Sequence, residues 1–255
     1  MMSQPFDFIG ARGQRLAGRL DVPPGDVHAW AVFAHCFTCT MNSLAAARIA
    51  QALAQRGIGV LRFDFTGLGQ SEGDFADSTF SGDVADLACA VRALEAAGKA
   101  PGLLVGHSLG GAAVLAAAGT LEGISAVATL GAPFEVGHVA NQFGPALAEI
   151  EAQGEAQVNL GGRPFHVRRQ FLDDLAHQDQ AARIHALHRP LLVMHAPRDA
   201  VVGVENAQAI FAHAVHPKSF VSLDDADHLL TRASDAEYAA EIIAAWASRY
   251  LVARS

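Results

Sequence analysis

The chain has 255 residues, of which 51% are hydrophobic and 17% charged, and its formal net charge is −8. This composition excludes a disordered chain, and the length suits a single α/β domain over residues 1–255 that carries an insertion. The acidic balance, with no basic cluster beyond Arg168-Arg169, argues against nucleic acid or an anionic membrane as a partner.

Few features of the sequence indicate the cellular compartment of the protein. The first residues lack the basic, apolar and small-residue order of a secretory signal, and apolar stretches such as 110–121 are too short to span a bilayer. The three cysteines, Cys36, Cys39 and Cys89, do not resemble a disulfide framework. We therefore expect a cytoplasmic protein with reduced thiols, and the sequence leaves its oligomeric state open.

Strands and helices alternate along the first part of the chain. Two short strands are expected over 6–10 and 15–22, followed by a Pro-Pro-Gly turn. The continuous apolar run 29–35 predicts a central strand. The patterns then predict, in order, a helix over 43–56, a strand over 59–63, a Gly-rich loop over 66–73 and a helix over 78–97.

The alternation continues to the end of the chain with one long gap. The predicted elements are a strand over 102–106, a helix over 110–120 and strands over 124–130, 190–195 and 219–223, with helices over 204–214 and 235–250. Strands and helices that alternate at this spacing predict an α/β fold with a mostly parallel sheet covered by helices on both faces.

The gap at 134–189 does not follow this pattern. It contains an acidic helical piece at 145–153 and a stretch at 158–167 that predicts a small hairpin turning at Gly161-Gly162. A long insertion in a compact domain usually has a function, so we predict a lid or cap over a pocket. The alternative is a surface excursion without a role.

The strongest chemical signal is Ser108, in the run Gly106-His107-Ser108-Leu109-Gly110-Gly111. A serine hydroxyl is a poor nucleophile at neutral pH and needs both a base and an exposed position. Flanking glycines permit the strained strand-to-helix turn that exposes the hydroxyl, and this run lies between a predicted strand and a predicted helix. Ser108 is therefore the candidate nucleophile.

The acid of a catalytic triad is expected after a late strand, since the chain order in this kind of site is nucleophile, acid, base. Asp199 follows the strand predicted over 190–195 and is our candidate. Its alternative role is that of a turn-forming residue beside Pro197. Glu135, just after the preceding strand, is a weaker candidate for the acid.

The base is expected beyond the last strand, where His228 meets the requirement. His213 and His216 lie on or at the end of a predicted helix and are better explained as solvated side chains. His107 adjoins the nucleophile, but successive side chains diverge at such a turn. We expect His107 to support the turn rather than act as the base.

An acyl-transfer intermediate needs two hydrogen-bond donors for its oxyanion. One is expected to be the N–H of Leu109, which follows the nucleophile. The second is expected from the loop after the strand 29–35, and we assign it to the N–H of Phe37, with Cys36 as the neighbouring possibility. Four phenylalanines are candidate pocket walls, with ordinary core packing as the alternative: Phe37, Phe134, Phe143 and Phe165.

Other motifs carry weaker signals. Cys36-Phe37-Thr38-Cys39 is a Cys-x-x-Cys motif, but the chain has too many predicted parallel strands for a thioredoxin and no second pair for zinc. The histidines show no metal-binding spacing, and the Gly-rich loop lacks dinucleotide-site spacing. We predict no metal and no cofactor, and two packed thiols in the oxyanion loop.

Several runs together resemble a known family. The segments 33–39, 61–69, 106–111 and 219–230 are similar to the hydrolase half of α/β-hydrolase/OsmC fusion proteins, and the similarity extends over nearly the whole chain. The sequence ends at Ser255, so we expect no peroxidase-like OsmC half. More distantly, the His-x-Phe-Thr loop and the Arg-Phe-Asp-Phe run resemble bacterial feruloyl and cinnamoyl esterases, although Cys36 stands where those esterases usually carry glycine.

The resemblance implies an α/β-hydrolase fold and a serine esterase with a lid that shapes an acyl or aryl pocket. It implies the same site residues as the patterns, namely Ser108, Asp199 and His228 with the N–H groups of Phe37 and Leu109. The leading hypothesis is therefore a carboxylesterase acting on a small-molecule ester. The alternatives are an acyltransferase or perhydrolase that uses the same acyl-enzyme, and a non-catalytic ligand receptor or redox module on this fold.

Overall fold

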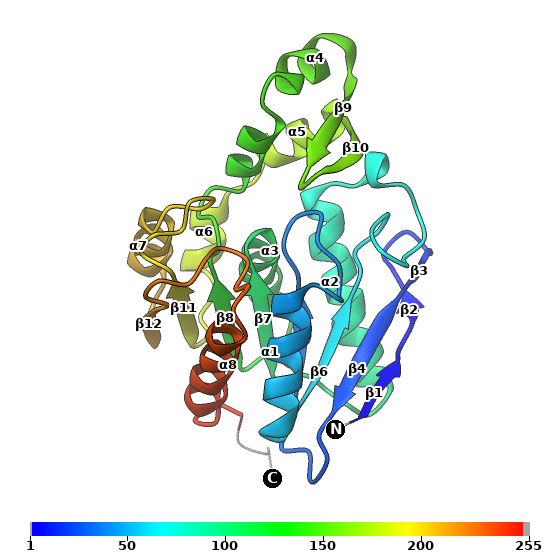
Figure 1. The fold of residues 1–255 in the computed structure, drawn as a ribbon. Coiled ribbons are helices and arrows are strands. Elements are labelled where there is room, and N and C mark those ends of the chain that lie inside the picture. The colour runs from blue at the N-terminus through cyan, green and yellow to red at the C-terminus, as the bar shows by residue number, and fades with distance from the viewer. Residues whose placement is uncertain (1, 252–255) are drawn as a thin grey trace.

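An eight-stranded sheet forms the centre of the protein in the computed structural model, which describes residues 2–251 (Figure 1). The strands lie in the order β1-β4-β6-β5-β7-β8-β11-β12. Their bounds are β1 Met2–Pro5, β4 Gly18–Val22, β6 Ile58–Phe63, β5 Ala29–Ala34, β7 Leu103–His107, β8 Ala126–Leu130, β11 Leu191–His195 and β12 Lys218–Ser222.

From β6 to β12 all neighbouring strands are parallel, whereas β1 and β4 run antiparallel at one edge. The predicted parallel α/β sheet is confirmed. The N-terminal prediction was less accurate, because the stretch 15–22 divides into β3 (Arg15–Leu16) and β4. The break falls at Ala17, which, within residues 2–251, forms no ladder hydrogen bond with a neighbouring strand. Its N–H donates to Ser71 Oγ, and its carbonyl accepts from the N–H of Asp64.

Helices cover both faces of the sheet, as Figure 1 shows. The helices α1 (Leu44–Gln55) and α8 (Ala233–Ala247) pack together on one face, against inward-facing side chains such as Phe33 and Val60. The helices α2 (Phe80–Ala96), α3 (Leu109–Ala118), α6 (Gln180–His185) and α7 (Glu205–His213) cover the opposite face. Side chains alternate between two cores along inner strands such as β5 and β11, and burial on both faces explains why these strands are mostly apolar.

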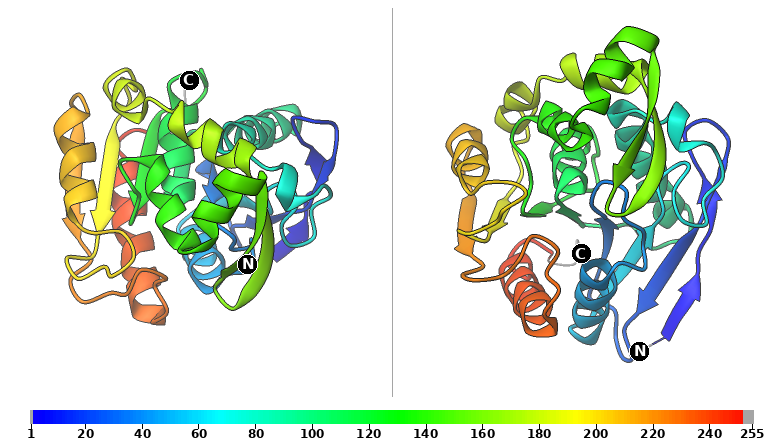
Figure 2. Two further views of the ribbon diagram at one scale, coloured as in Figure 1. Left: turned by 90° about the horizontal axis from the view of Figure 1, so that it is seen from above. Right: turned by 45° about the horizontal axis from the view of Figure 1, so that its top comes forward.

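The irregular segment between β8 and β11 rises above the sheet at the end where the parallel strands finish (Figures 1 and 2). It contains η2 (Val136–Phe143), α4 (Ala146–Gln153), the antiparallel pair β9 (Glu155–Leu160) and β10 (Arg163–Arg168), and α5 (Arg169–Ala176). The predicted hairpin is confirmed. Gly161 and Gly162 both have positive φ, as a two-residue type I′ turn requires.

Two short elements complete the structure: β2 (Phe8–Ile9), which pairs with β3, and the 3-10 helix η1 (Phe75–Asp77). Within residues 2–251, none of the helices is long and apolar enough to cross a bilayer.

Candidate active site

Ser108 occupies a sharp turn between β7 and α3, with φ 55° and ψ −124°. Such a conformation is strained for a residue with a side chain. The glycines beside it are required by close backbone contacts, since a Cβ at Gly106 would lie 2.3 Å from the carbonyl oxygen of Gly110, and one at Gly110 would lie 2.3 Å from that of Ala34. The turn therefore presents Ser108 at the carboxyl end of the sheet, against the loop that follows β5.

Ser108, His228 and Asp199 form one chain of hydrogen bonds. His228 Nε2 lies 3.0 Å from Ser108 Oγ, and His228 Nδ1 lies 2.7 Å from Asp199 Oδ2. The three residues come from loops that follow β7, β11 and β12, and the parallel sheet brings these loops to one edge. The sequence-predicted nucleophile, acid and base thus meet at hydrogen-bond distance.

Three hydrogen bonds and one longer contact hold the two oxygens of the Asp199 carboxylate. Oδ1 accepts the backbone N–H groups of Val201 and Val202 at 2.8 and 2.9 Å, while Oδ2 faces His228 and lies 3.6 Å from His195 Nε2. Burial pushes the pKa of Asp199 upward, but the hydrogen bonds from His228 and Val202 outweigh it and lower the pKa below its ordinary value. Asp199 is therefore anionic at neutral pH and can orient the imidazole.

Two further histidines hydrogen-bond to the backbone of the loops that carry His228 and Asp199. His107 Nε2 donates to the backbone carbonyl of His228 at 2.7 Å, and His195 Nε2 donates to the carbonyl of Val202 at 2.8 Å. Burial, followed by the proximity of His228, lowers the pKa of His107 to about 4. His107 therefore fixes the loop of the base. Sequence reasoning missed His195, whose place as the last residue of β11, directly before the acid's loop, was the available signal.

The oxyanion loop, residues 35–39, follows β5 and carries Phe37. Within residues 2–251, neither the N–H of Phe37 nor that of Leu109 donates to another protein group. The carbonyl of Cys36 accepts from His35 Nδ1 at 2.8 Å and from the N–H of Cys39 at 3.1 Å. Because a trans peptide holds its C=O and N–H on opposite sides, anchoring this carbonyl orients the N–H of Phe37.

The cysteines depart from the expectation of two packed thiols. Cys36 and Cys39 form a disulfide across the oxyanion loop, with their Cα atoms 5.3 Å apart, whereas Cys89 is free. The expectation was wrong because the loop turns back on itself: Thr38 adopts φ 57°, a rare conformation outside glycine, and so brings the two residues together.

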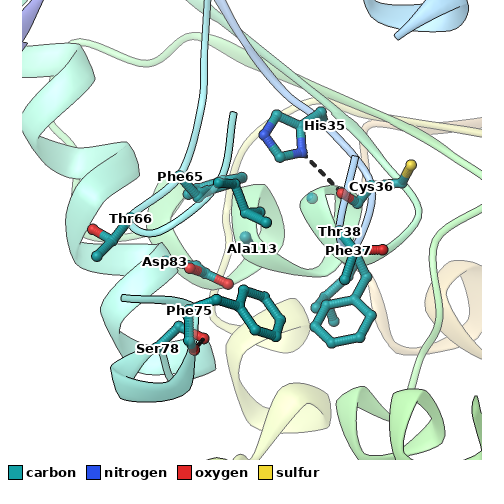
Figure 3. A pocket seen from close by; sticks show the side chains of 13 residues that line it. His35, Cys36, Phe37, Thr38, Phe65, Thr66, Phe75, Ser78, Asp83 and Ala113 are labelled. Carbon is teal, nitrogen blue, oxygen red and sulfur yellow. Dashed lines mark hydrogen bonds between the residues drawn. The ribbon is translucent and has the colours of Figure 1, made fainter. Parts of the chain in front are cut away.

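A narrow cleft, open to solvent, adjoins the oxyanion loop and the start of α3 (Figure 3). Rings and aliphatic groups form most of its wall, and Asp83 points its carboxylate toward the space between Ala113 and Phe75. The main lining residues are Phe37, Phe65, Leu68, Phe75, Leu109, Thr38, Ser78 and Asp83.

Of the four predicted wall residues, Phe37 lines this cleft, whereas Phe143 and Phe165 are not among its lining residues and belong to an aromatic cluster packed around Phe37 and Phe75. Phe37 lies 6.2 Å from Phe143 between ring centroids, and Phe165 lies 4.7 Å from Phe75, which in turn contacts Phe37. Sequence reasoning missed Phe75 and also Phe171, a further ring stacked on Phe37. Phe134 lies elsewhere, with its ring against His213 and its N–H donated to Asn206.

Glu135, the weaker candidate for the acid, is exposed. Two carboxylates in the loop of His228, Asp225 and Asp227, accept hydrogen bonds from Arg232 and Thr231, respectively. The part of the chain that the structure describes contains no group of three or more His, Cys, Asp or Glu placed to hold a metal ion.

Comparison with known proteins identifies the family. Residues 27–242 match the model of the alpha/beta hydrolase family. The chain belongs to this family. The esterase domain of a Rhodothermus marinus protein is 47% identical to this chain, and the similarity covers 98% of this chain and 100% of that one with a TM-score of 0.81.

More distant similarities agree on the fold. Est1E from Butyrivibrio proteoclasticus, solved with ferulic acid, superposes with a TM-score of 0.83 at 20% identity, covering 96% of this chain and 98% of that one. The uncharacterized protein YfhR of Salmonella typhi is 25% identical over 178 residues, which are 69% of this chain and 57% of YfhR. The match thus spans little more than half the length of that relative. The predicted α/β-hydrolase fold and the resemblance to its esterases are confirmed.

Proposed function

We propose that this protein is a serine hydrolase that cleaves carboxylic esters of small acyl or aryl acids through an acyl-enzyme on Ser108. The observation that carries the proposal is the continuous hydrogen-bonded chain from Asp199 through His228 to Ser108 Oγ. The 47% identity to an esterase domain supports the same class of reaction.

The geometry supports a two-step reaction. His228 Nε2 takes the proton of Ser108 Oγ as the serine attacks the ester carbonyl, and the N–H groups of Phe37 and Leu109 receive the oxyanion. His228 then protonates the leaving alcohol, which departs and leaves the acyl group on Ser108. A water molecule deprotonated by His228 attacks this acyl group and releases the acid. Asp199 keeps the imidazole in the required tautomer throughout.

The aromatic cluster supports the assignment of the acyl side of the substrate to the cleft beside Phe37. We assign the segment 134–189 to a lid, because Phe143, Phe165 and Phe171 from that segment pack on Phe37 and Phe75 of the main domain. Arg163 also reaches from the hairpin to donate to the carbonyl of Thr38 in the oxyanion loop. The lid and the oxyanion loop therefore share one wall of the proposed pocket.

The test is hydrolysis of a series of p-nitrophenyl esters, combined with labelling by a fluorophosphonate probe. We expect turnover of the shorter esters and probe attachment at Ser108, both lost in Ser108→Ala. Ser248→Ala is the matched control, because Ser248 is exposed near the end of the chain. Product analysis with added alcohol or peroxide separates hydrolysis from acyl transfer and perhydrolysis. Folded protein that neither turns over esters nor reacts at Ser108 refutes the proposal.

A further inference from the structure

The disulfide between Cys36 and Cys39 is not used by the reaction described above, yet it spans the loop that carries the proposed oxyanion donor. Only Phe37 and Thr38 lie between the two cysteines, and both cysteines belong to the turn from β5 toward α1. Cys36 also lines the cleft beside the nucleophile turn. A covalent bond at this place fixes local geometry at the site itself.

A role in global stability explains this bond poorly. A disulfide stabilises a fold mainly by restricting the unfolded chain, and the restriction is small when the closed loop is as short as this one. Cys36 is buried, but Cys39 is only half-buried. Cys39 is thus the more exposed residue of the pair, and we expect an attacking thiolate to reach it first.

The loop geometry couples the disulfide to the oxyanion hole. The carbonyl of Cys36 is held by the N–H of Cys39, which the disulfide keeps close, and by His35 Nδ1. That carbonyl and the N–H of Phe37 belong to one planar peptide, so they turn together. Two thiols cannot remain at bonding distance, so reduction separates the sulfurs of Cys36 and Cys39 and loosens one of the two anchors of this peptide.

We propose that Cys36 and Cys39 form a thiol–disulfide exchange site that controls the esterase activity, with the disulfide form more active than the dithiol form. The inference rests on the proposed serine hydrolase function. The reacting partner is a dithiol, either a small molecule or the reduced Cys-x-x-Cys site of a reductase.

The exchange is balanced in both directions. A thiolate of the dithiol attacks Sγ of Cys39, the Cys36–Cys39 bond breaks, and Cys36 leaves as a thiolate. The second thiol of the reagent then attacks the mixed disulfide and releases Cys39. The reagent ends as a disulfide, and its two protons end on Cys36 and Cys39. A disulfide reagent reverses both steps and restores the bond.

The experiment compares the full chain after incubation with dithiothreitol and with oxidised dithiothreitol. Alkylation with iodoacetamide under denaturing conditions, read by mass spectrometry, counts the free thiols in each form, and we expect three after reduction and one after oxidation. Because removal of one oxyanion donor typically costs 10²–10³ in kcat, we expect loosening one to lower kcat by about tenfold or more. KM changes little, because the oxyanion contact forms in the transition state.

Three variants sharpen the comparison. Cys39→Ser has the low kcat of the reduced protein under both conditions. Cys36→Ser removes the other sulfur of the bond, and the same low kcat is expected under both conditions. Cys89→Ser is the matched control, since this free cysteine lies on α2, and it responds to reduction as the unmodified protein does. The comparison of the reduced and oxidised unmodified chain does not depend on any variant folding.

The outcomes separate the two proposals. Equal kcat in the one-thiol and three-thiol forms overturns the exchange site while leaving the hydrolase intact, as does failure of the disulfide to form under oxidising conditions. Absence of both ester turnover and fluorophosphonate labelling in the reduced form and in the oxidised form alike refutes the proposed function, and the exchange site with it.

Discussion

Acidification provides a quantitative test of the site, because His107 is buried and holds the carbonyl of His228. Its pKa is lowered to about 4 by burial and by the nearby His228, whereas an imidazole in an unfolded chain titrates near 6.5. As the pH falls below 6.5, the imidazole of residue 107 binds a proton in the unfolded state but stays neutral in the folded state. Stability is therefore lost progressively between about pH 6.5 and pH 4.

The magnitude follows from the two pKa values. At pH 5 the unfolded imidazole is almost fully protonated while folded His107 is mostly neutral, which costs about 2 kcal/mol of unfolding free energy relative to pH 7.5. The full cost, reached below pH 4, is about 3 kcal/mol.

The assay is urea denaturation of the unmodified protein and of His107→Gln at pH 7.5 and pH 5. Glutamine retains an N–H donor for the carbonyl of His228 but does not titrate. The unmodified protein should lose about 2 kcal/mol more than the variant between the two pH values, because effects of all other groups are shared. Equal losses in the two proteins would refute the assignment of this pH dependence to His107.

Four other substitutions test the environment of the site. Asp199→Asn should lower kcat by about 10⁴-fold with little change in Tm, because the amide favours the wrong imidazole tautomer, and a loss below tenfold contradicts the role of Asp199. Burial, and then the charges of Asp86 and Asp174, raise the pKa of Asp83 well above its usual range. Asp83→Asn should therefore raise Tm at pH 7 and lose this advantage toward pH 4. Asp86→Asn is the control and should lower Tm, because the Asp86 carboxylate accepts several hydrogen bonds. A lower Tm for Asp83→Asn than for Asp86→Asn at pH 7 contradicts this prediction. Arg163→Met should speed proteolysis of the hairpin by about fivefold, the effect of one hydrogen bond of about 1 kcal/mol, and unchanged protection shows that the contact with the oxyanion loop does not hold the lid.

Most of the sheet and the order of the site residues could be predicted because they rest on local patterns. The inner parallel strands β7, β8 and β11 are buried on both faces and are therefore mostly apolar, and the glycines around Ser108 reflect backbone contacts within one turn. The positions of Asp199 and His228 followed from chain order, since loops after parallel strands must emerge at the same edge of the sheet.

The details of the pocket depended on contacts between residues distant in sequence. His107 reaches the carbonyl of His228 across 121 positions, and Arg163 reaches Thr38 across 125. No periodicity encodes such pairs, because they depend on how far each loop extends once the sheet is formed. For the same reason Phe75 and Phe171 were missed, and Phe134 was expected at a cleft where the structure does not place it.

By itself, the sequence determined the doubly covered parallel sheet and the candidate nucleophile, acid and base, since strand burial, tight glycine turns and chain order act locally or through simple topology. Only the tertiary structure decided that Cys36 and Cys39 are joined and which rings pack on Phe37 and Phe75. A left-handed residue at Thr38 and the fold of the hairpin over the oxyanion loop bring those groups together, and both depend on packing that no short segment specifies.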